Sequence, residues 1–148
     1  MIYIASDHAG YELKNKLVEF LKTQGLEVED LGPFEFNPED DYPDYIFPCA
    51  QKVAEDSESL GITIGGTGQG EAMVANKVKG VRAAVFYGGP QEIIKLSKEH
   101  NNANVLSLGA RFLRDEEAKQ AAKVWFETKF SEEERHVRRL KKISKLER

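Results

Sequence analysis

The chain has 148 residues, of which 41% are hydrophobic and 31% charged, so it is long enough for one domain and typical of a folded globule. Its single cysteine, Cys49, excludes an intramolecular disulfide framework and a multi-cysteine zinc site, and no apolar run approaches the roughly 20 residues that span a bilayer. The net charge of −4 argues against a nucleic-acid or anionic-membrane binder. The chain begins with a short apolar run and no basic leader, so we expect a cytoplasmic protein.

The charge is unevenly spread along the chain. Residues 135–148 hold seven Lys or Arg against one Glu, a charge of +6, which leaves −10 on the rest of a chain whose total is −4. A small basic end on an acidic body indicates a small anionic ligand.

Short apolar runs alternate with helical patterns along most of the chain. In chain order the sequence predicts strand Ile2–Ser6, helix Tyr11–Gln24, strand Leu26–Leu31, helix Tyr42–Glu55, strand Gly61–Gly65, helix Gln69–Val78, strand Arg82–Phe86, helix Gln91–His100 and strand Asn104–Leu108. Asp115 is then expected to N-cap a helix that ends near Thr128, and Ser131 to open a capping box before the basic terminal helix.

Strands that alternate with helices predict an α/β fold with a parallel sheet, right-handed crossovers and helices on both faces. We expect one domain over residues 1–148, with no repeat or linker, and the longest loop at residues 32–42, where Glu39, Asp40 and Asp41 form an acidic run. In such a sheet the ligand crevice lies beyond the carboxyl ends of the strands. Four polar or glycine-rich segments follow predicted strands and should meet there: 6–10, 65–71, 87–90 and 107–111.

The segment 65–71 has glycine at positions 65, 66, 68 and 70, which brings backbone N–H groups close to a ligand and suits an anion or a developing oxyanion. It is neither a P-loop nor a dinucleotide fingerprint, and a tight strand-to-helix turn is the plain alternative. Glu71 follows at the start of a helix, where the macrodipole alone can explain an acid. As a general base it would instead be buried, and the two interpretations shift its pKa in opposite directions.

The three histidines lie at predicted loop edges or in the basic cluster: His8 after the first strand, His100 after the fourth helix and His136 in the terminal helix. One such histidine is more often structural, but all three together favour proton transfer or anion binding. No HxH or HExxH spacing occurs, so the sequence predicts no metal site.

Arg135 and Arg139 lie one helical turn apart on the same face, and two converging guanidinium groups suit a phosphate dianion. A solvated basic helix end explains the same spacing. Arg111 stands alone among apolar and small residues at a strand end, which makes it the stronger single candidate for phosphate.

Together these residues predict proton abstraction next to a carbonyl on a phosphorylated sugar, without metal or cofactor. Two other classes stay open. A phosphometabolite- or nucleotide-binding module would need the glycines and arginines but not Glu71 or His100. A hydrolase built on Asp7 and His8 is disfavoured, because no serine lies on a Gly-x-Ser-x-Gly elbow.

The sequence resembles the type B ribose-5-phosphate isomerases, which share a fold with the galactose-6-phosphate isomerase subunits. Six short strings carry the resemblance from end to end: Ser6-Asp7-His8-Ala9-Gly10, Asp41-Tyr42-Pro43, Gly66-Thr67-Gly68-Gln69-Gly70, Ala75-Asn76-Lys77, His100-Asn101-Asn102-Ala103 and Arg135-His136-Val137-Arg138-Arg139. The resemblance implies a Rossmann-like three-layer fold with a five-stranded parallel sheet and a C-terminal helix. It also implies a homodimer, or a dimer of dimers, whose sites are shared between subunits.

The resemblance also implies roles for individual residues. His100, with Asp7, would open the furanose ring; Thr67 would relay the proton between O1 and O2; and the amides of Gly66, Gly68 and Gly70 would support the enediolate. Tyr42 and Asn101 would line the sugar. The phosphate would be held by His8, Arg111, Arg135, His136 and Arg139. The loops at Asp7 and Gly66 would come from one chain, and His100, Asn101 and the later arginines from the other.

One position departs from many members of that family, which carry a cysteine as the C2 base immediately before Gly-Thr-Gly. This chain has Gly65 there and matches the branch that uses the glutamate of Gly-Gly-Ser/Thr-Gly-x-Gly-Glu, so the base is assigned to Glu71. Cys49 lies far from every motif and is expected to be a packing residue. The expected reaction interconverts ribose 5-phosphate and ribulose 5-phosphate through a cis-enediolate, with allose 6-phosphate, galactose 6-phosphate or a tetrose phosphate as alternative substrates.

Overall fold

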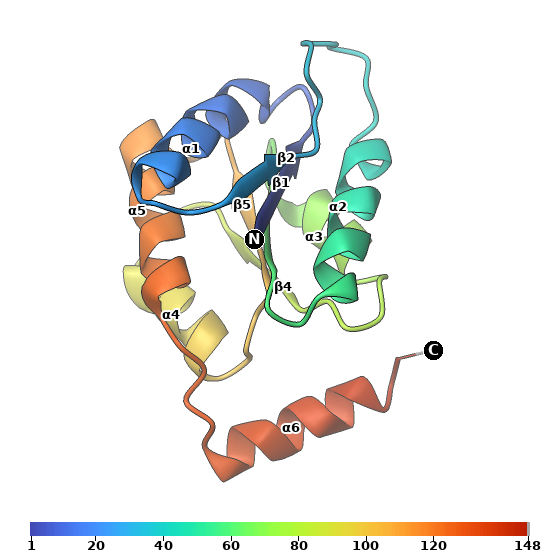
Figure 1. Cartoon of the computed structure of the whole chain (residues 1–148), viewed down its shortest axis with the longest axis vertical. Helices are drawn as coiled ribbons and strands as arrows, with labels where there is room; N and C mark the ends of the chain where they lie inside the picture. Colours follow the sequence, from blue (N-terminus) through green and yellow to red (C-terminus); the bar gives the residue numbers. More distant parts are fainter. Residues whose placement is uncertain (148) are drawn as a thin grey trace.

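The computed structural model describes residues 1–147 and contains five parallel strands in one sheet, in the order β2-β1-β3-β5-β4 (Figure 1). The elements in chain order are β1 Ile2–Ser6, α1 Tyr11–Thr23, β2 Val28–Asp30, α2 Pro43–Glu55, β3 Leu60–Gly65, α3 Gln69–Ala75, β4 Ala83–Phe86, α4 Gln91–Glu99, β5 Val105–Gly109, α5 Asp115–Glu127 and α6 Glu134–Ser144. The predicted α/β class and five-stranded parallel sheet are confirmed.

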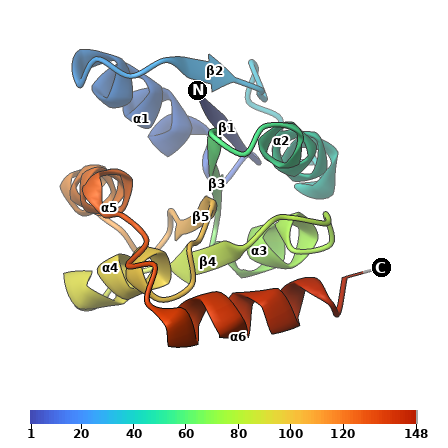
Figure 2. The same ribbon diagram turned by 60° about the horizontal axis from the view of Figure 1, so that its bottom comes forward.

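Helices cover both faces of the sheet, which makes three layers (Figure 2). One apolar core joins the sheet to α1, α4 and α5 and includes the fully buried Trp125, whereas the other joins it to α2 and α3. Cys49 lies fully buried in this second core, as expected of a packing residue, and burial raises the pKa of its thiol to about 12.

Local chemistry explains where several elements end. Gly25 has φ = +80° directly after α1, a left-handed conformation that glycine adopts without a steric penalty. The helix α3 is shorter than predicted, because the side-chain amide of Asn76 pairs with both backbone groups of Ala83, accepting from its N–H at 2.8 Å and donating to its carbonyl at 3.2 Å. This pairing turns the chain out of the helix and toward β4. The strand β2 is also shorter than predicted, as is common for a strand at the edge of a sheet.

The two predicted helix caps are wrong. The N-cap of α5 is Arg114, and Asp115 is the first residue of the helix. The Glu117 carboxylate accepts hydrogen bonds from the backbone N–H of Arg114 at 3.0 Å and from the Nε of Arg114 at 2.9 Å. The last helix begins at Glu134 rather than after Ser131. The Ser131 hydroxyl accepts a hydrogen bond from the N–H of Glu133 at 3.4 Å. Because Glu133 precedes the first residue of α6, this bond forms a local turn and does not cap the helix.

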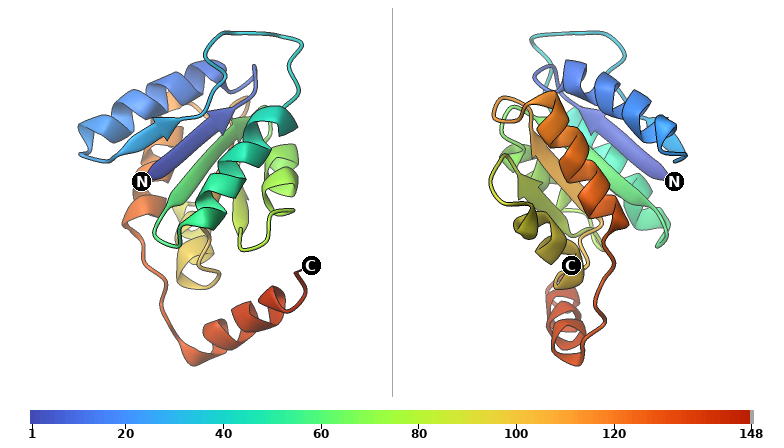
Figure 3. Two further views of the ribbon diagram at one scale, coloured as in Figure 1. Left: turned by 45° about the vertical axis from the view of Figure 1, so that its right-hand side comes forward. Right: turned by 90° about the vertical axis from the view of Figure 1, so that its left-hand side faces the viewer.

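The helix α6 stands apart from the three layers and contributes to neither core (Figure 3). Its connection is tied to the end of α4 by the Ser131 N–H, which donates to the Glu99 carbonyl at 3.1 Å. At its other end the Glu147 carboxylate accepts from the Gly80 N–H at 2.9 Å. Between these ties α6 crosses the end of the sheet where the strands begin. No helix among residues 1–147 has the length and apolar character needed to cross a membrane.

Candidate active site

The loops that follow β1, β3 and β5 are joined at the carboxyl end of the sheet. The Asp7 N–H donates to the Ile64 carbonyl at 3.3 Å, and the Arg111 N–H donates to the Gly66 carbonyl at 3.1 Å. Ser107 Oγ donates to the Gly68 carbonyl at 2.6 Å and so fixes the glycine-rich turn against β5. The predicted meeting of these segments at one edge of the sheet is therefore observed.

The carboxylate of Glu71 lies buried in the space left by the missing side chain at Gly65. Only 4% of Glu71 is exposed, and a Cβ atom added to Gly65 would collide with the Glu71 carboxylate. A cysteine at position 65 and this placement of the glutamate thus exclude one another. Burial, helped by the nearby charge of Asp7, raises the pKa of Glu71, while hydrogen bonds from the backbone N–H groups of Gly68 and Glu71 act in the opposite direction. Burial therefore outweighs the helix N-terminus in setting the pKa of Glu71.

Two further side chains approach the glycines of this turn closely. A Cβ on Gly66 would lie 3.1 Å from Nη1 of Arg111, and a Cβ on Gly70 would lie 2.8 Å from the hydroxyl of Tyr42. Both side chains therefore pack directly on the bare backbone of the turn. Thr67 Oγ1 accepts from the Gln69 N–H at 3.2 Å, so its own hydroxyl proton is free to donate to a ligand.

His8 is held at the same edge by Asp40, a residue that the sequence did not single out for function. His8 Nδ1 lies 2.7 Å from Asp40 Oδ1, and the same oxygen accepts from the His8 backbone N–H at 3.1 Å. The Asp7 carboxylate accepts from the Gly10 N–H at 3.1 Å, which fixes the turn between the strand and α1. The sequence signal for Asp40 was its place in the acidic run beside Asp41 and Tyr42.

Asp7, His8 and Asp40 also form the one group of potential metal ligands found among residues 1–147, with donor atoms within 4.8 Å of one another. Two of these residues already bond to each other, His8 through Nδ1 and Asp40 through Oδ1, at 2.7 Å.

A second cluster contains His100 and His136, whose rings stack with centroids 4.2 Å apart and planes 17° from parallel. Arg135 Nε donates to His136 Nε2 at 3.3 Å, and Arg135 Nη2 lies 3.1 Å from a Glu133 carboxylate oxygen. Burial lowers the pKa of His136, and the neighbouring His100 and Arg135 add to this effect. The Arg139 side chain is exposed on the next turn of the helix.

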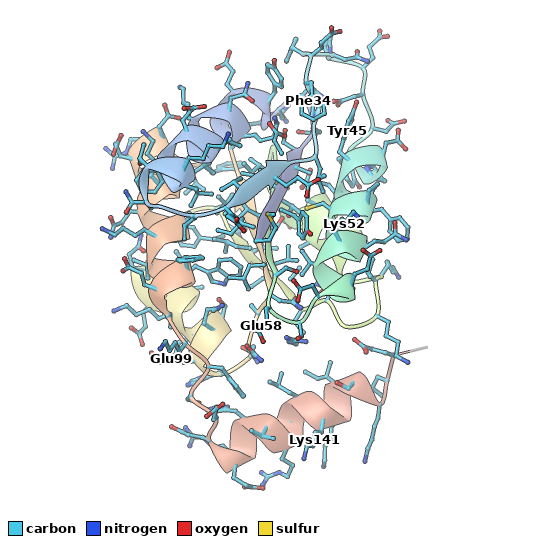
Figure 4. All side chains as sticks on the ribbon, viewed as in Figure 1. Phe34, Tyr45, Lys52, Glu58, Glu99 and Lys141 are labelled. Atoms are coloured by element: carbon cyan, nitrogen blue, oxygen red, sulfur yellow. The ribbon has the colours of Figure 1, made fainter. Side chains whose placement is uncertain are left out.

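The two clusters lie at opposite ends of the sheet within one chain. Glu71 and His8 are at the end where the strands finish, whereas His100 follows α4, which returns to the end where they begin. The five residues of β5 separate these ends by about 16 Å. In Figure 4 the label at Phe34 lies near the first end, and the label at Glu99, which precedes His100, lies near the second.

The predicted site residues divide accordingly. The carboxyl end of the sheet gathers Asp7, His8, Tyr42, Gly66, Thr67, Gly68, Gly70, Glu71 and Arg111. The opposite end carries His100, Asn101, Arg135, His136 and Arg139. Within one chain the predicted site residues therefore form two separate groups, one at each end of the sheet.

A family model described as ribose/galactose isomerase matches residues 2–143. The chain belongs to this family. A ribose-5-phosphate isomerase B from Mycobacterium leprae is 39% identical over 147 residues, which cover 99% of this chain and 90% of the relative.

Solved structures named as ribose-5-phosphate isomerase B superpose closely on the chain. A ribose-5-phosphate isomerase B from Mycoplasma genitalium, solved with bound ribulose-5-phosphate, is 46% identical with a TM-score of 0.93 and covers 97% of this chain and 93% of its own. The ribose-5-phosphate isomerase B from Clostridium thermocellum is 40% identical with a TM-score of 0.90, covering 98% of this chain and 95% of its own. The family match runs to residue 143, within α6.

Proposed function

We propose that the protein is a metal-independent aldose–ketose isomerase that interconverts ribose 5-phosphate and ribulose 5-phosphate. The observation that carries the proposal is the Glu71 carboxylate, which is buried in the gap at Gly65 with a raised pKa. A raised pKa makes a carboxylate a stronger base at neutral pH, which suits removal of a proton next to a carbonyl. The relatives named as ribose-5-phosphate isomerase B support this choice of reaction.

In the proposed reaction His100, with Asp7, opens the furanose ring by moving a proton from the C1 hydroxyl to the ring oxygen. Glu71 then removes the C2 proton, and the electron pair forms the cis-enediolate. The protonated Glu71 returns that proton to C1, while Thr67 passes a proton between O2 and O1. Backbone N–H groups of Gly66, Gly68 and Gly70 stabilise the developing negative charge.

The phosphate is assigned to guanidinium and imidazole side chains from both half-sites. His8 and Arg111 lie at the same edge as Glu71, and Arg135 and Arg139, with His136 beside them, would approach from the other side. Tyr42 and Asn101 would line the sugar between the two groups. Guanidinium groups suit this task because they can bond two phosphate oxygens at once.

The separation of the half-sites supports a homodimer, with the possibility of a dimer of dimers built from it, in which α6 and the end of α4 reach the partner. A groove of about 630 Å³ lies between α6 and the start of β4, with apolar lining from Val81, Ala83, Leu140 and Ile143. Ile143 is also 46% exposed, so the free chain leaves apolar surface beside this groove. A second copy would cover this surface and supply the missing half of each site. A pentose phosphate isomerase of this kind would work in the cytoplasm.

The decisive experiment replaces Glu71 with Gln and follows the exchange of the C2 proton with solvent. We expect the exchange and the turnover to fall by a factor on the order of 100 or more, with sugar-phosphate binding still measurable. Glu117 is a matched control, because it also occupies the third position of a helix, but its pKa is lowered by hydrogen bonds from Arg114. Glu117→Gln should keep normal turnover. Near-normal turnover of Glu71→Gln would exclude this base.

The matched family is described as ribose/galactose isomerase, which favours a hexose phosphate as the second candidate substrate. Pentose, hexose and tetrose phosphates differ by one or two carbons. Assays of isomerisation with ribose 5-phosphate, allose 6-phosphate, galactose 6-phosphate and erythrulose 4-phosphate would rank them. Binding of these sugars without any proton exchange would instead support a phosphometabolite-binding module.

A further inference from the structure

The loop between β2 and α2 places one buried acid against the candidate phosphate-binding histidine. The Asp40 side chain is only 4% exposed, whereas that of its partner His8 is 27% exposed. One oxygen, Asp40 Oδ1, contacts both the ring Nδ1 at 2.7 Å and the backbone N–H at 3.1 Å of His8. The acid therefore holds the histidine at two points, and the ring keeps one edge toward solvent.

This contact determines how the imidazole can act. A carboxylate only accepts hydrogen bonds, so Nδ1 must carry the proton that the pair shares, and Nε2 is left for a ligand. Nε2 can donate to a phosphate oxygen only when the ring is doubly protonated, and a carboxylate on the opposite edge balances that positive charge. Within residues 1–147 the second oxygen, Asp40 Oδ2, is buried and has no hydrogen-bond partner. His8 is thus the group on which the Asp40 charge acts.

The same loop links this pair to the rest of the site. Phe36 packs edge-on against the His8 ring, with centroids 6.3 Å apart. Two residues after Asp40, Tyr42 packs on Gly70 beside the turn that leads into α3. A displacement of Asp40 would therefore change the orientation of His8, whereas Tyr42 is held in place by its own contact with Gly70.

We propose that Asp40 is a positioning residue, which orients the His8 imidazole so that Nε2–H points at the substrate phosphate and balances the charge of the doubly protonated ring. This inference rests on the proposed function, in which His8 binds the phosphate. Asp40 acts only through His8 and does not touch the reacting carbons. Its loss should therefore weaken phosphate binding and leave the chemical step unchanged.

The first test measures kinetics and the binding of inorganic phosphate in Asp40→Ala, Asp40→Asn and Glu39→Ala. We expect Asp40→Ala to raise KM and the phosphate Kd about 10-fold with kcat within about twofold, because a charge-assisted hydrogen bond is lost. Asp40→Asn, whose amide oxygen still accepts from Nδ1, should recover part of the affinity. Glu39→Ala removes one negative charge from the same exposed loop without touching His8 and should not weaken binding.

Whether Asp40→Ala weakens or tightens phosphate binding shows whether Asp40 acts by orienting His8 or only through its negative charge. Removing a negative charge near an anion site should tighten phosphate binding by Coulomb attraction, so weaker binding in Asp40→Ala requires the contact with His8. The double variant His8→Ala/Asp40→Ala should bind phosphate no more weakly than His8→Ala alone. Additive losses, or tighter phosphate binding in Asp40→Ala, would overturn the proposal.

A second test uses ¹⁵N NMR to determine which ring nitrogen of His8 carries the proton. The chain has three histidines, so His8→Ala identifies the His8 signals. We expect the native protein to hold the proton at Nδ1 when the ring is neutral, and Asp40→Ala to move it to Nε2. A native ring protonated at Nε2 alone would refute the inference. The NMR and inorganic-phosphate measurements need no turnover, so they test Asp40 even if ribose 5-phosphate is not isomerised.

Discussion

If the two groups of site residues form one active site across a dimer, as proposed, two inactive variants should complement each other. Glu71→Gln disables the half-site at the carboxyl end of the sheet, and His100→Ala disables the one at the opposite end. Within one chain these ends are separated by about 16 Å of strand, which is too far for a direct proton relay across one pentose. Each variant alone should lose on the order of 100-fold or more in turnover.

In a twofold dimer each site combines the Glu71 end of one chain with the His100 end of the other. A mixed dimer of the two variants then has one site with both substitutions and one site with neither. Random exchange makes about half of the dimers mixed, each with one of two sites intact, so an equimolar mixture should recover about a quarter of native activity. The assay is turnover of ribose 5-phosphate after the two variants are unfolded and refolded together.

Two controls make the result decisive. Each variant refolded alone should stay inactive, and differently tagged chains should co-purify to show that mixed dimers formed. If mixed dimers form and the mixture stays as inactive as either variant alone, the two half-sites do not meet across subunits, and the argument from the geometry of the sheet is refuted.

Three further predictions follow from single contacts. Gly65→Ala should lower turnover about 100-fold or more, because the added Cβ displaces the Glu71 carboxylate; steady-state kinetics would check this, and native turnover would contradict the packing. The raised pKa of Glu71 means that its ionisation opposes folding, so Glu71→Gln should raise Tm more at pH 8 than at pH 2.5, where the carboxyl is protonated in both the folded and the unfolded protein; an equal gain at both would refute the shift. For the same reason, the acid limb of kcat/KM should lie above the ordinary glutamate pKa of about 4.3. Cys49, with a pKa raised to about 12, should resist thiol reagents until the protein unfolds, and rapid labelling of the native protein would contradict its burial.

Much of the fold could be predicted because its signals are local in the chain. Apolar runs and helical spacing identified all five strands and the helices between them, although β2 is shorter than predicted at both ends and α3 ends earlier. The two misplaced caps show the limit of this reasoning. Ser131 has the right side chain for a cap, but its backbone N–H is held by the Glu99 carbonyl, a contact that no local pattern reveals.

What the sequence by itself determined is the class of chemistry and the edge of the sheet where its main parts meet. Parallel strands must place their carboxyl ends together, so the glycine turn, Glu71, His8 and Arg111 had to converge. Tertiary structure alone decided the rest. Burial against Gly65 set the direction of the Glu71 pKa shift, and Asp40 reached His8 across 32 residues of chain. Because a helix that connects parallel strands must run back along them, α4 returns to the opposite end of the sheet and carries His100 away from Glu71.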